Sequence, residues 1–311
     1  MIRSRVLLAR TTCLFIVTLC HGFVSPAFCR DAIKIPITVD RGRTILPVTT
    51  GASPRMGIIL DTGMTFDGLL VYNRKMTRYL DLDEAFEVRV PGAGGGEPAK
   101  GVMVDSSSFF IGAFEIKNQK IIVLRSDIYD GFPTDGVLGY SVFGHYAVEL
   151  DYDTGTMTLH DPDEVKITDG WTTIPLYFKN RKIPWMNVSV VVADEDPVEL
   201  SVYIDFAAGD VIELLEKDDM KFALPEKTRK AYLGTGLSGD IHGKKGTISQ
   251  LLIGPYALAE VEAAFAPARI RSKQEDADGI VGGGCFQRFH VIFDYHNNRL
   301  LLKPNSAFGK R

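Results

Sequence analysis

One internal repeat constrains the fold of this chain more than any other feature of its sequence. The stretch Gly57–Asp61 ends in Ile-Leu-Asp, and its counterpart Val202–Asp205 ends in Tyr-Ile-Asp. The stretch Asp135–Gly139 returns in the same way as Asp278–Gly282. Measured at the aspartates, the first pair of blocks is offset by 144 residues and the second pair by 143. A nearly constant register predicts two copies of one folding unit.

Two further pairs of blocks support the same division. Phe109–Gly112 is matched by Leu251–Gly254, and Ala147–Tyr152 is matched by His290–Tyr295, the latter pair again offset by 143 residues. We expect three parts, namely a signal peptide with a short mature start at 1–30, a first lobe at 31–165 and a second lobe at 166–311.

Short apolar or alternating runs, bounded by clusters of Gly, Pro and Asp, are typical of strands. Such runs occupy 34–39 and 86–90, and Val148–Leu159 contains two more around the turn residues Asp-Thr-Gly. Helix is expected only at Leu224–Tyr232 and just after Gly139. The pattern predicts an all-β fold with two pseudo-symmetric lobes.

The composition is that of a globular protein with a sizeable core, because 45% of the 311 residues are hydrophobic. The formal net charge is −4. Four of the 35 Lys and Arg residues lie in the first thirty positions, which contain no acid, so the remainder is distinctly acidic. Phosphate backbones repel an acidic chain, and we expect no nucleic-acid partner.

The N-terminal residues have the pattern of an export signal. Arg3 and Arg5 precede the apolar run Cys13–Cys20, and Ser25–Ala27 then offers small residues for cleavage. The apolar run is much shorter than the roughly 20 residues that a membrane-spanning helix needs. We therefore expect a periplasmic or extracellular protein with no stable membrane span after signal cleavage.

Cysteine and histidine give no sign of a bound metal or cofactor. Cleavage after Ala27 leaves Cys29 and Cys285, too few for a disulfide framework, and the sequence leaves open whether these two pair. The six histidines are scattered along the chain. We expect neither a metal nor a cofactor.

Aspartate occurs at three matched positions of the two copies, and the local sequence separates their roles. Asp61 and Asp205 follow apolar runs and precede small residues, an environment that perturbs a carboxylate pKa. The other two pairs have structural explanations. Asp135 and Asp278 each precede Gly, which is typical of a turn, and Asp151 and Asp294 each stand at a strand end that we expect to be solvated.

Asp61-Thr62-Gly63 is the tripeptide found at aspartic peptidase active sites, but three residues alone are weak evidence. The same tripeptide at Asp153–Gly155 is typical of a plain hairpin turn. The apolar strand before Asp61 and the repeat distinguish the two cases.

The order of the motifs resembles a retropepsin-like aspartic protease of the bacterial secreted type, in the pepsin and retropepsin clan. An apolar strand, Asp-Thr-Gly, a glycine-rich hairpin, an Ile-Gly strand, Asp-Gly-Val-Leu-Gly and Val-Glu-Leu-Asp-Tyr follow one another, and the similarity returns in the second copy. The resemblance implies two retropepsin-like β-barrel lobes with an active-site cleft between them. It also implies structural roles for Gly139 and Gly282, where glycine lets two backbones approach closely.

The resemblance further implies that Asp61 and Asp205 form a catalytic dyad, with Thr62 and Gly63 in the first active-site loop. Two close carboxylates do not readily both ionise, so one holds a proton while the other acts as a base on water. The activated water attacks a peptide carbonyl, and this chemistry needs no metal or nucleotide.

The second loop departs from the family pattern, because Phe206 and Ala207 stand where the family has Thr and Gly. The paired threonines of the family brace the two loops against each other, and Thr62 here would face Phe206. The departure leaves two functions open, an aspartic endopeptidase or a catalytically inactive relative that binds peptides or other proteins.

Two glycine-rich stretches, 91–98 and 234–239, occupy the position of the family's flap, a mobile hairpin that closes over extended substrate. The second also fits G-x-G-x-x-G, but a dinucleotide site needs a helix next, and residues 240–246 are poor helix formers. An ordinary surface loop is the other explanation. The candidate flap glycines are Gly92, Gly94, Gly95, Gly96, Gly234 and Gly236.

We therefore expect an exported, monomeric aspartic endopeptidase that cleaves an extended polypeptide held under one or two flaps. Met64 and Ala208 stand where many aspartic peptidases place a Ser or Thr that bonds to the catalytic carboxylate. Phe206 adds apolar bulk beside Asp205. Both features predict raised apparent pKa values for the aspartate pair.

Overall fold

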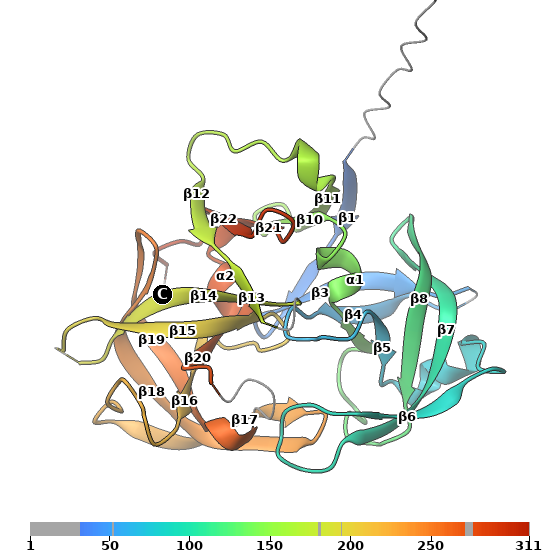
Figure 1. Ribbon diagram of the computed structural model, residues 1–311, viewed down its shortest axis with the longest axis horizontal. Coiled ribbons are helices and arrows are strands. Elements are labelled where there is room, and N and C mark those ends of the chain that lie inside the picture. Colours follow the sequence, from blue (N-terminus) through green and yellow to red (C-terminus); the bar gives the residue numbers. More distant parts are fainter. Residues whose placement is uncertain (1–31, 52, 180–181, 194, 271–275, 311) are drawn as a thin grey trace, which may run out of the picture. The chain divides into compact units, whose positions relative to one another are not determined.

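The computed structural model describes residues 32–310 apart from 52, 180–181, 194 and 271–275, and strands dominate it (Figure 1). All of these residues belong to one compact unit. The expected signal peptide and Cys29 lie outside the described residues. The few helical segments are short: α1 (Tyr140–Phe143), α2 (Gly283–Phe286), η1 (Arg74–Tyr79), η2 (Pro162–Glu164) and η3 (Ala268–Ile270).

The first lobe contains an eight-stranded sheet. Its strands lie side by side in the order β2 (Thr38–Asp40), β3 (Arg43–Thr49), β4 (Met56–Leu60), β9 (Gly136–Leu138), β5 (Gly68–Val71), β8 (Phe114–Leu124), β7 (Ala99–Ile111) and β6 (Phe86–Val90). Strand β3 also pairs with β7, which closes six of the strands into a barrel. The central strands are apolar throughout because both of their faces are covered.

The second lobe repeats this sheet strand for strand. Its order is β13 (Tyr177–Lys179), β14 (Ile183–Val191), β15 (Val198–Asp205), β20 (Gly279–Gly282), β16 (Ile212–Glu216), β19 (Tyr256–Pro267), β18 (Gly239–Ile253) and β17 (Thr228–Gly236). Here β14 pairs with β18 and closes the barrel. In both lobes the strand that leads to the candidate aspartate runs parallel to the short Gly-containing strand, β4 beside β9 and β15 beside β20.

A six-stranded sheet joins the two copies. Its order is β1 (Ile33–Pro36), β11 (Thr156–His160), β10 (Ala147–Asp151), β21 (Phe289–Asp294), β22 (Arg299–Pro304) and β12 (Thr172–Pro175). The seam between the copies is the antiparallel pair β10 and β21, where Val148 lies opposite Phe293. The expected hairpin around Asp153–Gly155 is confirmed as β10 and β11.

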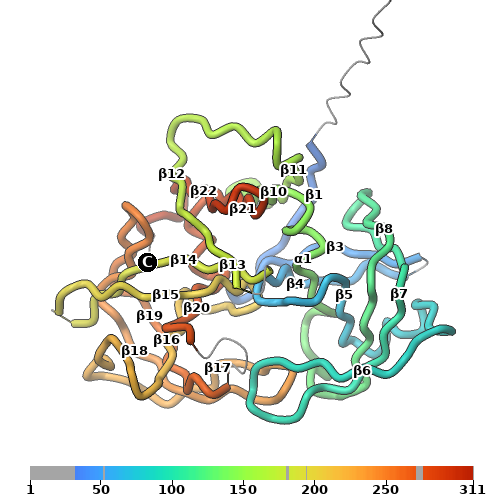
Figure 2. The backbone as a smooth tube through the Cα atoms, in the orientation of Figure 1, coloured from blue at the N-terminus to red at the C-terminus, as the bar shows by residue number. Residues whose placement is uncertain are grey.

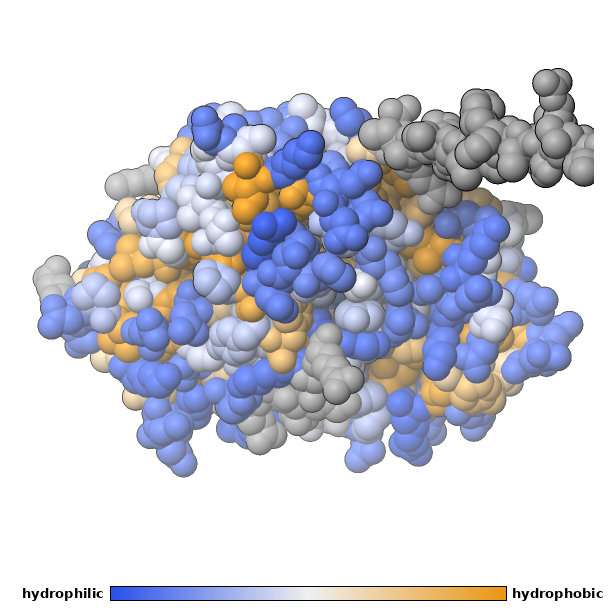
Figure 3. Space-filling view, turned by 45° about the horizontal axis from the view of Figure 1, so that its top comes forward, coloured by the Kyte–Doolittle hydropathy of each residue, from blue (hydrophilic) through white to orange (hydrophobic). Residues whose placement is uncertain are grey.

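The core runs through both lobes and under this sheet. Apolar side chains from both copies form one buried cluster, while the face seen in Figure 3 is mostly hydrophilic with smaller apolar areas between the polar side chains. Burial of apolar surface on this scale is the main stabilising contribution to the fold.

One expected element is wrong. Leu224–Tyr232 was expected to be helical, but residues 224–227 are irregular and the rest belongs to strand β17. Strand β17 pairs along its length with β18. The local preference for helix is therefore overridden by strand pairing within a β-hairpin. The expected helix after Gly139 is confirmed as α1.

Candidate active site

Two equivalent strands deliver the candidate aspartates. Strand β4 ends at Leu60, and Asp61 follows it directly, while Asp205 is the last residue of β15. The backbone N–H of Asp61 donates to the carbonyl of Leu138 at 2.8 Å, which ties the start of the first loop to β9. Each carboxylate thus stands at the end of a buried strand in the middle of its sheet.

The backbone holds the two carboxylates in the same way. The N–H of Gly63 donates to Asp61 Oδ1 at 2.8 Å, and the N–H of Ala207 donates to Asp205 Oδ1 at 2.9 Å. Ala208 adds a longer bond of 3.3 Å to the same Asp205 oxygen. Replacement of Gly by Ala in the second loop therefore leaves the bond from the second residue after the aspartate in place.

The two loops meet between the lobes. A Cβ placed on Gly63 would lie 2.8 Å from Asp205 Cγ, so only glycine permits this approach. Burial at the junction and, next, the negative charge of Asp205 raise the pKa of Asp61 well above its ordinary value. The N–H groups of Gly63 and Met64 act in the opposite direction.

Thr62 connects the first loop to the second. The side chain is 2% exposed, and its hydroxyl donates to the carbonyl of Ile204 at 2.8 Å and accepts from the N–H of Phe206 at 3.1 Å. Arg43 supplies another connection, because its Nε donates to the carbonyl of Ala207 at 2.7 Å. The first lobe therefore braces the second loop through backbone groups of that loop.

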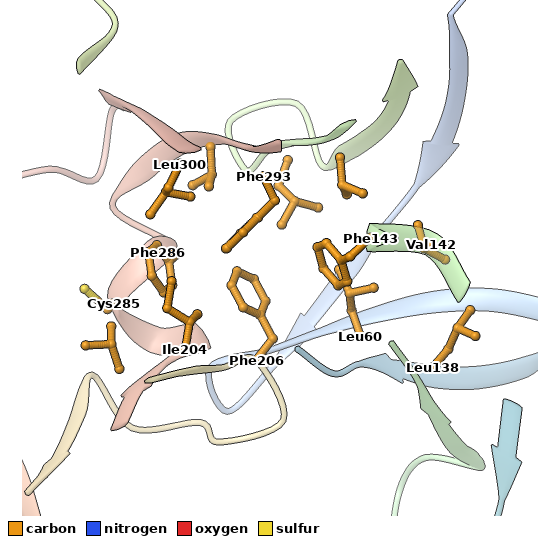
Figure 4. Packing of buried hydrophobic residues seen from close by; sticks show 14 of the residues in the cluster. Leu60, Leu138, Val142, Phe143, Ile204, Phe206, Cys285, Phe286, Phe293 and Leu300 are labelled. Carbon is orange, nitrogen blue, oxygen red and sulfur yellow. The ribbon is translucent and has the colours of Figure 1, made fainter. Parts of the chain in front are cut away.

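The Phe206 side chain turns away from the loops into the shared core. It is fully buried, stacks on Phe286 with ring centroids 5.2 Å apart and meets Phe293 edge to face. Figure 4 shows the ring among Ile204 and Phe286 of its own lobe, with Leu60 and Phe143 of the first lobe nearby. The phenyl ring contributes to packing and leaves Asp205 in place against Gly63.

Gly139 and Gly282 lie where backbones almost touch the two loops. A Cβ on Gly139 would lie 2.2 Å from the carbonyl oxygen of Asp61. A Cβ on Gly282 would lie 2.2 Å from the carbonyl oxygen of Asp210 and 2.7 Å from that of Ala208. Any side chain at these two positions displaces the loop that holds the aspartate.

Asp135 and Asp278 do more than form turns, which sequence reasoning missed. Asp135 Oδ2 accepts from the N–H of Gly57 at 2.7 Å, and Asp278 Oδ2 accepts from the N–H of Ser201 at 2.9 Å. Each carboxylate therefore holds the strand that leads to a candidate aspartate. Burial acts to raise the pKa of Asp278, but Lys221, the Ser201 N–H and Lys217 together lower it. The repetition of these two aspartates at the common offset was the sequence feature that could have indicated this role.

The expectation of a solvated strand end is wrong for Asp294. This residue is fully buried, and its carboxylate accepts from Arg299 Nε at 2.7 Å and from the Asn297 side chain at 2.8 Å. The turn after Asp294 folds both partners back onto it. Its counterpart Asp151 is half-buried and accepts from the backbone of the next turn.

The glycine-rich stretches form two loops that touch each other. The first joins β6 to β7, and the second lies at the turn of the β17–β18 hairpin. The N–H of Ser238 donates to the carbonyl of Ala93, and the N–H of Gly96 donates to the carbonyl of Ser238, both at 2.8 Å. A Cβ would come within 2.6 Å of the opposite loop at four of the candidate glycines, namely Gly92, Gly94, Gly96 and Gly236. Positive φ angles occur at Gly94, Gly95 and Gly234.

Comparison with known proteins places this arrangement in a known fold. Residues 46–142, which include Asp61 and the loop after it, match the family model of aspartyl proteases. The aspartic proteinase from Irpex lacteus is among the similar solved structures, with 16% sequence identity and a TM-score of 0.58. The match covers 90% of this chain and 99% of that one. The chain has the fold of a pepsin-like aspartic proteinase.

This pepsin-like fold confirms the predicted all-β, two-lobed class and the resemblance to aspartic proteases. No curated protein matches the sequence. Within residues 32–310 and outside the stated gaps, no group of three or more His, Cys, Asp or Glu side chains is placed to hold a metal. The same part of the chain contains no helix long and apolar enough to cross a membrane. Cys285 is buried, and its burial raises the pKa of the thiol to about 12.

Proposed function

We propose that this chain is an aspartic endopeptidase that hydrolyses peptide bonds with a water molecule activated by Asp61 and Asp205. In this mechanism Asp205 accepts a proton from the water, while Asp61 gives its own proton to the carbonyl oxygen of the substrate. The raised pKa of Asp61 supports this division of roles, because burial and, next, the charge of the neighbouring Asp205 favour the protonated form of the Asp61 carboxyl.

The observation that carries the proposal is the equivalence of the two loops. Both carboxylates follow strands of matched position, both accept an N–H from the second residue after the aspartate, and Asp205 contacts the first loop at Gly63. The structural pair Asp135 and Asp278 is also repeated, but each of these carboxylates bonds to a strand of its own lobe, whereas Asp205 meets the loop of the other lobe. Because both aspartates come from one chain, we propose that the monomer is active, and we propose export on the N-terminal pattern.

The proposal is tested with the Asp61→Asn and Asp205→Asn variants. Each is incubated with a mixture of peptides of diverse sequence, and new termini are identified by mass spectrometry. We expect wild-type protein to cleave and each variant to lose cleavage by at least about a thousandfold, while thermal unfolding shows both variants folded. Asp153→Asn, in the surface copy of the Asp-Thr-Gly tripeptide, is the matched control and retains activity. Full cleavage by Asp205→Asn would contradict a shared site.

A non-catalytic peptide-binding protein is the second candidate, and the composition of the second loop favours it. Phe206 is a core residue and Ala207 carries a Cβ in place of glycine. If wild-type protein binds peptides with an affinity that Asp61→Asn leaves unchanged, and cleaves none of them, this second function is supported and the first is rejected.

A further inference from the structure

The hairpin of the second lobe reaches across to the first lobe. Its turn carries Leu237 and Ser238, between β17 and β18. The two backbone hydrogen bonds between Ser238 and the loop at Ala93 and Gly96 hold this turn against the first lobe. Figure 2 shows β17 and the loop that follows β6 approaching each other. These bonds use backbone atoms only, so replacement of the Leu237 side chain leaves both of them in place.

The Leu237 side chain packs with apolar residues of the other lobe. It belongs to an apolar cluster whose other members all lie between residues 66 and 137, including the buried Tyr72 and the partly buried Tyr129 and Phe132. The Tyr129 hydroxyl donates to the carbonyl of Thr235 at 3.3 Å and so fixes the same turn. Leu237 is thus an apolar side chain that the second lobe contributes to the first.

This cluster lies near Asp61. One of its members, Phe66, follows Asp61 in the same loop. Another member, Val137, lies in β9 directly before Leu138, whose carbonyl accepts the N–H of Asp61 at 2.8 Å. The cluster therefore adjoins the loop that carries Asp61.

We propose that Leu237 is a specificity-determining residue, which takes up part of the apolar space beside Asp61 and leaves room there for small substrate side chains only. The inference rests on the proposed function. Leu237, Ser238 and Gly239 also line a hollow of about 720 Å³, whose outer part is charged and includes Glu87, Arg89 and Arg125. Val88 and Ala99 belong both to the lining of this hollow and to the apolar cluster. Removal of the Leu237 side chain enlarges the space at this apolar edge, so that a larger side chain fits.

The first test compares cleavage profiles of the wild-type chain, Leu237→Ala and Leu237→Phe on one peptide mixture. A single methylene in an apolar pocket changes selectivity by about tenfold or more. We therefore expect Leu237→Ala to raise cleavage next to Phe and Tyr, relative to cleavage next to Ala and Ser, by at least about tenfold. Leu237→Phe should lower the same ratio. Tyr232→Ala is the matched control, because Tyr232 lies on the same hairpin but is 56% exposed and should not alter the ratio.

The second test uses binding and does not depend on catalysis. Octapeptides with a single Phe or Ala, moved along a serine background, are titrated against Asp61→Asn with and without Leu237→Ala. The same rise in the affinity ratio of Phe over Ala peptides is expected. An unchanged ratio, or a gain that is equal for all peptides, would overturn the inference even when the proposed function holds. A changed binding ratio without cleavage in wild-type protein would reject the enzyme and retain the role of Leu237.

Discussion

Replacement of Thr62 by valine tests how the two lobes hold the aspartate loops together. Valine has nearly the same shape as threonine but cannot form a hydrogen bond. Thr62→Val therefore leaves the carbonyl of Ile204 and the N–H of Phe206 without their partner in a site where Thr62 is 2% exposed.

The expected loss of stability follows from these two groups. A buried polar group left without a partner costs about 1–3 kcal/mol, so the loss of both bonds in Thr62→Val should lower the free energy of unfolding by about 2–6 kcal/mol. Thr62→Ser keeps the hydroxyl and removes one methyl group, which should cost only about 1 kcal/mol. The difference between these variants isolates the contribution of the hydroxyl from that of packing.

The assay is urea denaturation at neutral pH, followed by tryptophan fluorescence and extrapolated to zero urea. The chain provides its own control in Thr154, which is exposed, occupies the middle of the second Asp-Thr-Gly tripeptide and bonds to the half-buried Thr156. Thr154→Val should change stability by no more than about 0.5 kcal/mol, as expected at a surface site. If Thr62→Val were as stable as Thr154→Val, the hydroxyl would not brace the lobes.

Three further predictions concern packing and charge. Gly139→Ala should destabilise the fold by about 1–3 kcal/mol, because its Cβ would lie 2.2 Å from the Asp61 carbonyl oxygen. Gly57→Ala is the control, since a Cβ there meets only ordinary contacts, and denaturation of both variants checks the difference. Because the pKa of Asp61 is raised in the folded protein, the stability of the wild type falls as pH rises from about 4 through that pKa. Asp61→Asn should therefore be more stable than the wild type at pH 7, and this difference should disappear near pH 3. Melting curves that keep the same separation at both pH values would contradict this. The hydrogen bond from His160, followed by that from His290, lowers the pKa of Glu149 to about 2. Glu149→Gln should therefore lower the free energy of unfolding by about 2–3 kcal/mol at pH 6, and by progressively less as pH falls from about 4.5 toward 2. Denaturation at each pH measures this.

The architecture was readable from the sequence because the repeat and the strand pattern depend on local composition. Apolar strands at one offset must bury equivalent faces, and the two eight-stranded sheets have the same strand order. The loops at Asp61 and Asp205 could be located for the same reason. The helix expected at Leu224–Tyr232 failed because pairing with β18, a separate strand, decides the conformation of that segment.

Features that depend on distant partners were not readable in this way. The direction of Phe206 is decided by Phe286 and Phe293, which lie far along the chain. The crossing of Leu237 into the first lobe depends on the contact between two loops that belong to different copies. In each case the tertiary contact has no counterpart in local sequence preference.

The unequal loops are consistent with a division of labour between the two copies. The first lobe supplies the side chains that brace the junction, Thr62 and Arg43, and the second loop supplies the backbone groups of Ile204, Phe206 and Ala207 that receive them. Backbone groups are present whatever the side chain, so position 206 is free to serve the core. An aromatic residue there stabilises the second lobe through Phe286 and Phe293 without displacing Asp205 from Gly63. The departure from Asp-Thr-Gly in the second copy is therefore compatible with two carboxylates that are held by equivalent backbone bonds.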